Sequence, residues 1–281
     1  MQEKIAFAKH EGLGNDFIIV EDLGNELHIM PPTVVHLCDR RFGIGADGLI
    51  LVRASLEADF KMEYHNSDGS TAEMCGNGLR CFAKYVYDHG LIEATRVTVE
   101  TGAGIKEIDL VFDGDCAVGA RVDMGYPALA ASEIPVTLEL GESNDVTLSV
   151  DGVAIKGTCV SMGNPHCVIF VDDVESAPVR ALGPKIETNP IFPRKTNVEF
   201  AKVVSPNEIE IRVWERGAGE TLACGTGACA TAVAAHLNGY TGRHTRINLP
   251  GGRLDIEWKD DGRIFMKGPA REVFTGEMRV R

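Results

Sequence analysis

Met74-Cys75-Gly76-Asn77-Gly78-Leu79-Arg80-Cys81-Phe82-Ala83 and Ala223-Cys224-Gly225-Thr226-Gly227-Ala228-Cys229-Ala230-Thr231-Ala232 share a rare Cys-Gly-x-Gly string. The two leading cysteines are 149 positions apart. The same offset carries Gly14-Asn15 onto Gly163-Asn164, each ahead of an apolar run, and Gly90 onto Gly239. One gap-free register therefore links landmarks across most of the chain. The sequence predicts two homologous halves that arose by duplication.

Each half follows the same local plan. An alternating strand leads into a polar, Gly-rich turn, then the cysteine, then a helix. In the first helix, Leu79, Phe82, Ala83 and Val86 have helical spacing, and Gly90 stands where a C-terminal cap is expected. Further strands are predicted at 49–52, 97–101, 106–112, 254–258 and 264–267. Many strands with one long helix per half predict an α+β fold.

Composition narrows the class of protein. The 281 residues suffice for two domains with their own cores. A net charge of -13 disfavours nucleic acid and anionic membranes as partners, because both would repel the chain. No apolar run resembles a signal peptide or a membrane span, so we expect a cytoplasmic protein. Its eight cysteines are then expected to be thiols, and six of them small buried hydrophobes.

Cys75 and Cys224 are the two exceptions, because each directly precedes a predicted helix. A helix N-terminus offers unpaired N–H groups and partial positive charge, which lowers a thiol pKa and binds a carboxylate. Two such ends fit inversion at an α-carbon, in which one base removes a proton and an acid on the other face delivers one. The plainer alternative is two tight strand-to-helix turns with buried cysteines. We find no metal-ligand cluster and no Schiff-base machinery, so neither metal nor cofactor is expected.

Four long strings together resemble the diaminopimelate epimerase family almost from end to end. They are His10-Glu11-Gly12-Leu13-Gly14-Asn15-Asp16-Phe17, Cys75-Gly76-Asn77-Gly78, Ser161-Met162-Gly163-Asn164-Pro165-His166-Cys167 and Glu215-Arg216-Gly217-Ala218-Gly219-Glu220-Thr221. The resemblance implies interconversion of LL- and meso-2,6-diaminopimelate, a step of lysine and peptidoglycan precursor synthesis. It also implies a homodimer and, in each domain, a mixed, barrel-like sheet around a central helix. The implied domains are 1–122 with 270–281, and 123–269.

The resemblance also implies roles for individual residues. Cys75 would be the proton donor and Cys224 the acceptor in the LL-to-meso direction. His166 and Glu215 would tune the thiols. The reacting carboxylate would be held by backbone groups of Gly76, Asn77, Gly225 and Thr226, and the rest of the substrate by Asn15, Asn66, Asn164, Asn197, Glu215 and Arg216.

One position departs from the family pattern. Gly48 stands where some members have glutamine, so no side-chain contact to substrate is expected there. The surrounding Gly43-Ile44-Gly45-Ala46-Asp47-Gly48 also reads G-x-G-x-x-G, but a strand-like run follows it where a dinucleotide site needs a helix.

Three other functions stay open on the sequence. A proline or hydroxyproline epimerase would show itself in a substrate screen. A binding module that kept the duplicated cleft would need neither thiol. A thiol redox sensor would form a stable disulfide and exchange no amino-acid proton with solvent.

Overall fold

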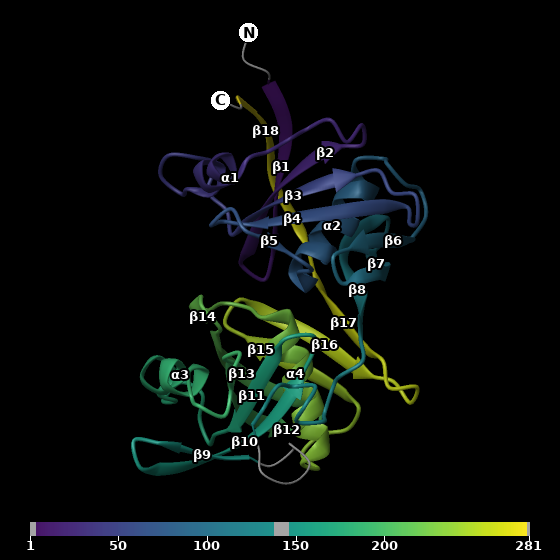
Figure 1. The fold of residues 1–281 in the computed structure, drawn as a ribbon. Helices are drawn as coiled ribbons and strands as arrows, with labels where there is room; N and C mark the ends of the chain where they lie inside the picture. Colours follow the sequence, from purple (N-terminus) through teal and green to yellow (C-terminus); the bar gives the residue numbers. More distant parts are fainter. Residues whose placement is uncertain (1–3, 138–145, 280–281) are drawn as a thin grey trace. The chain divides into compact units, whose positions relative to one another are not determined.

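The computed structural model describes residues 4–137 and 146–279 and divides into two compact units (Figure 1). Unit 1 comprises Met1–Asp123 and Lys267–Arg281, and unit 2 comprises Met124–Met266. The outermost positions of the expected domain ranges, 1–3 and 280–281, lie outside the described residues, as does the segment 138–145.

Unit 1 is built on helix α2 and a mixed sheet. Its strands pair in the order β18, β1, β2, β3, β4, β6, β7 and β8, with β5 as a short partner of β4. Within this sheet β2 runs parallel to β3, and β4 parallel to β6. The elements are β1 (Lys4–Gly12), β2 (Asn15–Asp22), α1 (Pro31–Cys38), β3 (Gly48–Arg53), β4 (Phe60–Asn66), β5 (Thr71–Ala72), α2 (Gly76–Asp88), β6 (Arg96–Thr101), β7 (Gly104–Asp113), β8 (Cys116–Gly125) and β18 (Arg271–Arg279).

Unit 2 repeats this plan around helix α4. Strands β9, β10, β11, β12, β13, β15 and β16 pair in that order, and β14 is the short partner of β13. The elements are β9 (Val146–Val150), β10 (Val153–Ser161), β11 (Pro165–Phe170), α3 (Val179–Glu187), β12 (Asn197–Ser205), β13 (Glu208–Glu215), β14 (Gly219–Thr221), α4 (Gly225–Leu237), β15 (His244–Leu249), β16 (Gly252–Trp258) and β17 (Ile264–Pro269), which belongs to unit 1 from Lys267 onward.

The 149-residue offset relates the two units element by element. It carries β1 onto β10 and α2 onto α4 with identical bounds. The parallel pairs also correspond, because Phe17 opposite Gly48 in unit 1 becomes His166 opposite Asn197 in unit 2. The predicted α+β fold of two homologous halves is confirmed.

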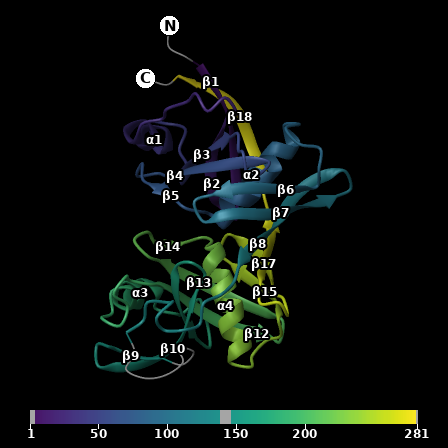
Figure 2. The same cartoon turned by 45° about the vertical axis from the view of Figure 1, so that its right-hand side comes forward.

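Local sequence explains the central helices. Leu79, Phe82, Ala83 and Val86 are all fully buried, which confirms the helical face read from the sequence. Both helices then stop at a glycine in the left-handed region, Gly90 at φ 70° and Gly239 at φ 73°, where other residues are disfavoured. Figures 1 and 2 show α2 and α4 each against strands of its own unit. The shorter helices α1 and α3 were not predicted from the sequence.

Each unit has its own apolar core. In unit 1, Ile18, Val20, Leu49 and Leu51 of β2 and β3 are fully buried, and α1 covers them with Val34. In unit 2, α3 packs with Val179 and Ile186 against β9, β12 and β13, among buried residues that include Phe200. Burial of such side chains stabilises each unit by about 1.5–3 kcal/mol per residue.

The burial of the cysteines differs from the sequence prediction at one position. Cys38, Cys81, Cys159, Cys167 and Cys229 are buried, as predicted. Cys116 is exposed at the start of β8, so the prediction of a buried hydrophobe is wrong there. None of the helices in the described part of the chain is both long and apolar enough to span a bilayer.

Candidate active site in two halves

The first half-site is centred on Cys75, the residue that caps the N-terminus of α2. Its backbone is extended at φ -139° and ψ 115°, so the helix begins at Gly76. The N–H of Gly78 donates to Cys75 Sγ at 3.4 Å, which satisfies one of the free donors of the first turn. The thiol is half-buried. The sulfur of Cys75 therefore lies at the start of the helix, as the sequence predicted.

Asn15, the first residue of β2, lies beside this thiol. Its Oδ1 accepts from Asn77 Nδ2 at 3.1 Å and faces Cys75 Sγ at 3.8 Å. Its Nδ2 donates to Asp47 Oδ2 at 2.8 Å. Because a carboxylate only accepts hydrogen bonds, Asp47 fixes the amide with its oxygen toward Cys75. A carbonyl oxygen in that place accepts from a thiol.

Asn66 ends β4 in the same unit. Its N–H donates to Ser70 O at 2.8 Å and its Nδ2 to Ser70 Oγ at 3.0 Å, so these two bonds close a turn. Asn66 pairs across the sheet with Gly48. A Cβ at position 48 would come within 2.5 Å of the Tyr64 ring and 2.6 Å of His65 O. Close packing therefore explains why a glycine stands there.

The second half-site repeats the capping arrangement at Cys224. This residue is extended at φ -124° and ψ 111° and caps α4, and Gly227 N–H donates to its Sγ at 3.4 Å. Its Sγ lies 3.6 Å from Thr226 Oγ1. Unlike Cys75, Cys224 is buried.

The prediction of a lowered thiol pKa is wrong for Cys224. Burial raises its pKa well above the ordinary value, and the carboxyl groups of Glu215 and Glu199 raise it further. Desolvation of a buried group shifts a pKa by up to about 3–5 units, which outweighs the roughly 0.3–2 kcal/mol of a helix terminus. Hydrogen bonds with the Thr226 side chain and the Gly227 N–H lower the pKa of Cys224, but they do not cancel the rise.

A chain of short contacts runs from Cys224 into the core of unit 2. Asn164 Nδ2 donates to Thr226 Oγ1 at 3.3 Å. Asn164 Oδ1 lies 3.1 Å from His166 Nε2, and His166 Nδ1 lies 2.7 Å from Glu199 Oε1. His166 and Glu199 are both fully buried.

The remaining expected residues of unit 2 lie on neighbouring strands. Asn197 Oδ1 accepts from the backbone N–H of Arg216 at 2.9 Å, and Asn197 Nδ2 donates to Pro165 O at 2.8 Å. The Arg216 side chain is exposed and donates to Arg194 O at 3.0 Å. Glu215 hydrogen-bonds to Thr221 and to Cys224, and burial raises its pKa. The structure thus joins Glu215 to the thiol, whereas the Arg216 guanidinium is exposed and bound to a backbone carbonyl.

Comparison with known proteins identifies the family. The family described as "Diaminopimelate epimerase" matches residues 7–130 and 158–273. Proteins of that name from Leptospira biflexa and Pelotomaculum thermopropionicum are 50% and 51% identical, over 99% and 98% of this chain and 100% and 99% of their own length. This chain belongs to the diaminopimelate epimerase family.

Solved structures extend the relationship at the level of fold alone. A hydroxyproline epimerase from Agrobacterium vitis superposes with a TM-score of 0.74 at 13% identity, covering 100% of this chain and 94% of the other. A phenazine biosynthesis protein of the PhzF family from Bacillus anthracis gives 0.71 at 16% identity, covering 99% of this chain and 100% of that one. The two-unit architecture is therefore shared by proteins of low sequence similarity.

Two residues beside the half-sites were missed by the sequence reading. Asp47 orients Asn15, and Glu199 contacts His166. A signal for Glu199 was present, because it is an acidic residue within the apolar run Val198-Glu199-Phe200-Ala201, where a buried charge requires a partner. Asp47 gave no such signal, because its Gly-rich surroundings read as an ordinary turn.

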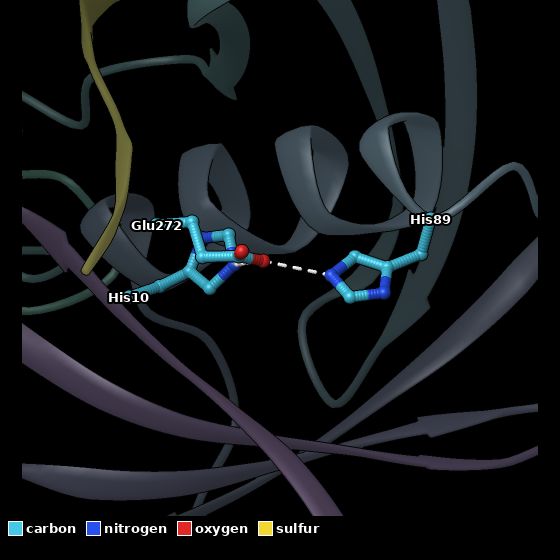
Figure 3. A group of neighbouring side chains, drawn as sticks. All are labelled: His10, His89 and Glu272. Carbon is cyan, nitrogen blue, oxygen red and sulfur yellow. Dashed lines mark hydrogen bonds and ion pairs between the residues drawn. The ribbon is translucent and has the colours of Figure 1, made fainter. Parts of the chain in front are cut away.

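Outside both half-sites, one cluster carries metal-binding residue types in unit 1 (Figure 3). Glu272 Oε2 lies 3.2 Å from His10 Nε2 and 2.7 Å from His89 Nε2. Burial lowers the pKa of His10 to about 4, so its ring is neutral. A metal on Nε2 would put the ring proton on Nδ1, which is buried with no partner among the residues described. We interpret the cluster as a hydrogen-bonded clamp between β1, the end of α2 and β18.

Proposed function

We propose that this chain interconverts LL- and meso-2,6-diaminopimelate with Cys75 and Cys224 as its two bases. The observation that carries this proposal is the presence, within this family, of two thiols at equivalent helix starts in homologous units. Inversion needs a group on each face of the α-carbon, and the duplicated fold supplies two groups of the same kind. In the LL-to-meso direction Cys75 donates a proton and Cys224 accepts one, and the roles exchange in reverse.

The reacting carboxylate is expected to bind at the two helix starts. The N–H groups of Gly78 and Gly227 already donate to the sulfurs. This leaves the backbone groups of Gly76, Asn77, Gly225 and Thr226 for the substrate. Helix N-termini stabilise negative charge, and the charge on the carboxylate grows as the α-proton leaves. No metal or cofactor is invoked in this mechanism.

The polar side chains then hold the remainder of the substrate. We assign Asn15, Asn66, Asn164, Asn197, Glu215 and Arg216 to substrate binding, with His166 and Glu215 also tuning the thiols. The exposed guanidinium of Arg216 suits bidentate binding of a distal carboxylate. The mechanism requires that both thiols reach the α-carbon of one substrate.

The cellular setting is part of the same proposal. We infer a cytoplasmic homodimer that acts in lysine and peptidoglycan precursor synthesis, with no nucleic-acid or membrane partner. The domain limits proposed are 1–122 with 270–281, and 123–269. The acidic net charge of -13 supports the exclusion of polyanionic partners.

Proton NMR of diaminopimelate in D₂O tests the proposed function directly. The purified chain should exchange an α-proton for deuterium and interconvert the two isomers, before and after treatment with a chelator and a carbonyl reagent. Exchange with proline or hydroxyproline in place of diaminopimelate would favour another isomerase. No exchange with any amino acid would refute the proposal, and a stable Cys75–Cys224 disulfide would then favour a redox sensor.

A further inference from the structure

A buried carboxylate lies behind one thiol and has no counterpart behind the other. The 149-residue offset relates Glu199 to Ile50 and His166 to Phe17. The positions are equivalent in space within each unit. A Cβ built on Gly227 would lie 2.7 Å from Glu199 Oε1, and one built on Gly78 would lie 3.2 Å from Ile50 Cδ1. The polar pair is therefore an addition to the second half-site.

The contacts of this pair fix the number of protons it holds. Asn164 Nδ2 donates to Thr226 Oγ1, so Asn164 Oδ1 faces His166 Nε2 and requires a proton there. A second proton must lie between His166 Nδ1 and Glu199 Oε1, which are 2.7 Å apart. With two protons the pair carries no net charge, which suits its complete burial. Glu199 Oε2 is buried without a partner in the part of the chain described, which also fits an uncharged pair.

We propose that Glu199 is a positioning residue that acts through His166 to set the direction of the hydrogen bonds reaching Cys224. With two protons on the pair, Asn164 donates to Thr226, and the Thr226 hydroxyl donates toward Cys224 Sγ. This direction supports a thiolate. With one proton on the pair, His166 Nε2 becomes an acceptor, and the Asn164 amide turns over. Thr226 then donates to Asn164, and Cys224 donates to Thr226 as a thiol.

The first half-site has no such choice. Asp47 holds the Asn15 oxygen toward Cys75, and the counterparts of the pair are the apolar Phe17 and Ile50. Here the Asn15 oxygen accepts from Cys75 as a thiol, and the Gly78 N–H donates to the same sulfur. The inference rests on the proposed function, because it assigns the second half-site the bonds that a proton acceptor needs.

Other titratable groups around the pair lie on the neighbouring strands. Glu215 on β13 hydrogen-bonds to Cys224, and burial raises the pKa of its carboxyl. Cys159 on β10 and Cys167 on β11 are buried thiols, and a hydrogen bond with Cys159 together with burial raises the pKa of Cys167 well above its usual value. The charge of Glu199 acts on Cys224 only when the pair holds one proton. Burial, the largest cause of the raised pKa of Cys224, acts in both states, and the charge of Glu199 raises that pKa further in the one-proton state.

Nitrogen-15 NMR of the histidine-labelled full chain reads the pair directly. His166 is assigned by the resonance lost in His166→Gln. We expect a directly bonded proton on Nε2 of His166 in the wild-type chain near neutral pH. A bare Nε2 would overturn the proposal, because the Asn164 amide would then face the other way.

Thiol alkylation followed by peptide mass spectrometry reads the coupling to Cys224. In the wild type we expect two linked steps in the pH profile of Cys224, because the direction of the hydrogen bond that reaches its thiol can reverse, and one step for Cys75. Glu199→Gln keeps the side-chain volume, and Glu199→Ile installs the residue of the first half-site. Both should reduce the Cys224 profile to a single step and leave Cys75 unchanged. Thr226→Val should do the same by breaking the path, whereas Thr226→Ser should preserve two steps.

Asp22→Asn is the matched control for loss of a buried carboxylate. Asp22 lies in unit 1, where it binds Arg53 and the backbone N–H groups of Glu26 and Leu27. It should keep two steps at Cys224. In Glu199→Gln, kcat should fall about 10-fold or more with KM within about two-fold, as expected for loss of a hydrogen bond to a charged group. Two steps surviving in both Glu199 variants, or an equal change at Cys75, would refute the inference. Neither spectroscopy nor alkylation needs diaminopimelate, so failure of the proposed function would be seen separately.

Discussion

The two half-sites share a backbone and differ in the side chains behind each thiol. Both cysteines cap 13-residue helices with the same extended backbone, and each accepts an N–H three residues on. Behind Cys75 stand Phe17 and Ile50, and behind Cys224 stand His166 and Glu199. The two units thus share the same capped helix start and place different side chains against it. Such inequality suits a reaction in which one thiol gives a proton while the other takes one.

The largest expected effect is the loss of either thiol. Cys75→Ala and Cys224→Ala should each lower epimerisation by about 10²–10⁴-fold or more, because each removes one of the two proton-transfer groups. The double variant should be no worse than the poorer single one, since the pair acts as a unit. Isomer interconversion followed by NMR measures this effect, with circular dichroism to check the fold. Normal turnover in either single variant would break the assignment of two equivalent bases.

The sequence predicted the parts of this comparison that depend on repeated local pattern. These parts are the repeated string at Cys75 and Cys224, the helical face of α2 and the capping glycines. Each can be recognised from a short stretch of sequence, and the structure confirms them. It did not predict α1 and α3, which are short and begin without a side-chain cap. Nor did it predict the raised pKa of Cys224, because burial, the largest cause, depends on long-range packing. Strand sequences give no measure of how deeply a helix start is covered.

The second expected effect is on stability. It follows from substitutions that give the second half-site the apolar character of the first. His166→Phe should destabilise the chain by about 3–5 kcal/mol, because it leaves Glu199 buried without its charge partner. His166→Phe with Glu199→Ile should recover most of that loss, since apolar replacement of a buried pair is often neutral or stabilising. Urea unfolding of the two variants and the wild type measures the difference.

Phe17→Leu in unit 1 is the matched control, because it changes an apolar residue at the equivalent position without exposing a charge. It should cost less than about 1.5 kcal/mol if the neighbouring side chains repack. A double variant as unstable as His166→Phe alone would show that the pair is not the source of the cost.

The third expected effect places a pH dependence of stability in unit 1. Burial lowers the pKa of His10 to about 4, against an ordinary value near 6.5. The unfolded chain then binds the proton more readily between these values, so stability falls as pH falls from about 6.5 to about 4, by roughly 3 kcal/mol. The corresponding residue in unit 2 is Cys159, and Asn238 stands in the place of His89.

His10→Met should flatten this part of the profile measured by urea unfolding at a series of pH values. Replacement of the exposed His244 by glutamine should leave the profile unchanged. An equal slope in wild type and His10→Met would assign the acid sensitivity to other groups, such as Glu272, whose pKa is held low by its hydrogen bond to His89.

The smallest expected effect compares one glycine in each first helical turn. At Gly78 an added Cβ would meet the end of the Ile50 side chain at 3.2 Å, and a rotation of that methyl group relieves the contact. At Gly227 it would meet Glu199 Oε1 at 2.7 Å and Cys224 Sγ at 3.3 Å, and Glu199 is held by its bond to His166. Gly78→Ala should therefore be nearly neutral, aided by a helix propensity gain of up to about 1 kcal/mol. Gly227→Ala should cost about 1–3 kcal/mol through overpacking.

Thermal unfolding of the two variants measures the difference, and Gly227→Ala in the Glu199→Ile background separates its causes. Because Ile has a flexible end and no carboxylate, the cost should shrink toward that of Gly78→Ala. An unchanged cost would mean that the sulfur of Cys224, and not Glu199, limits the space at this helix start.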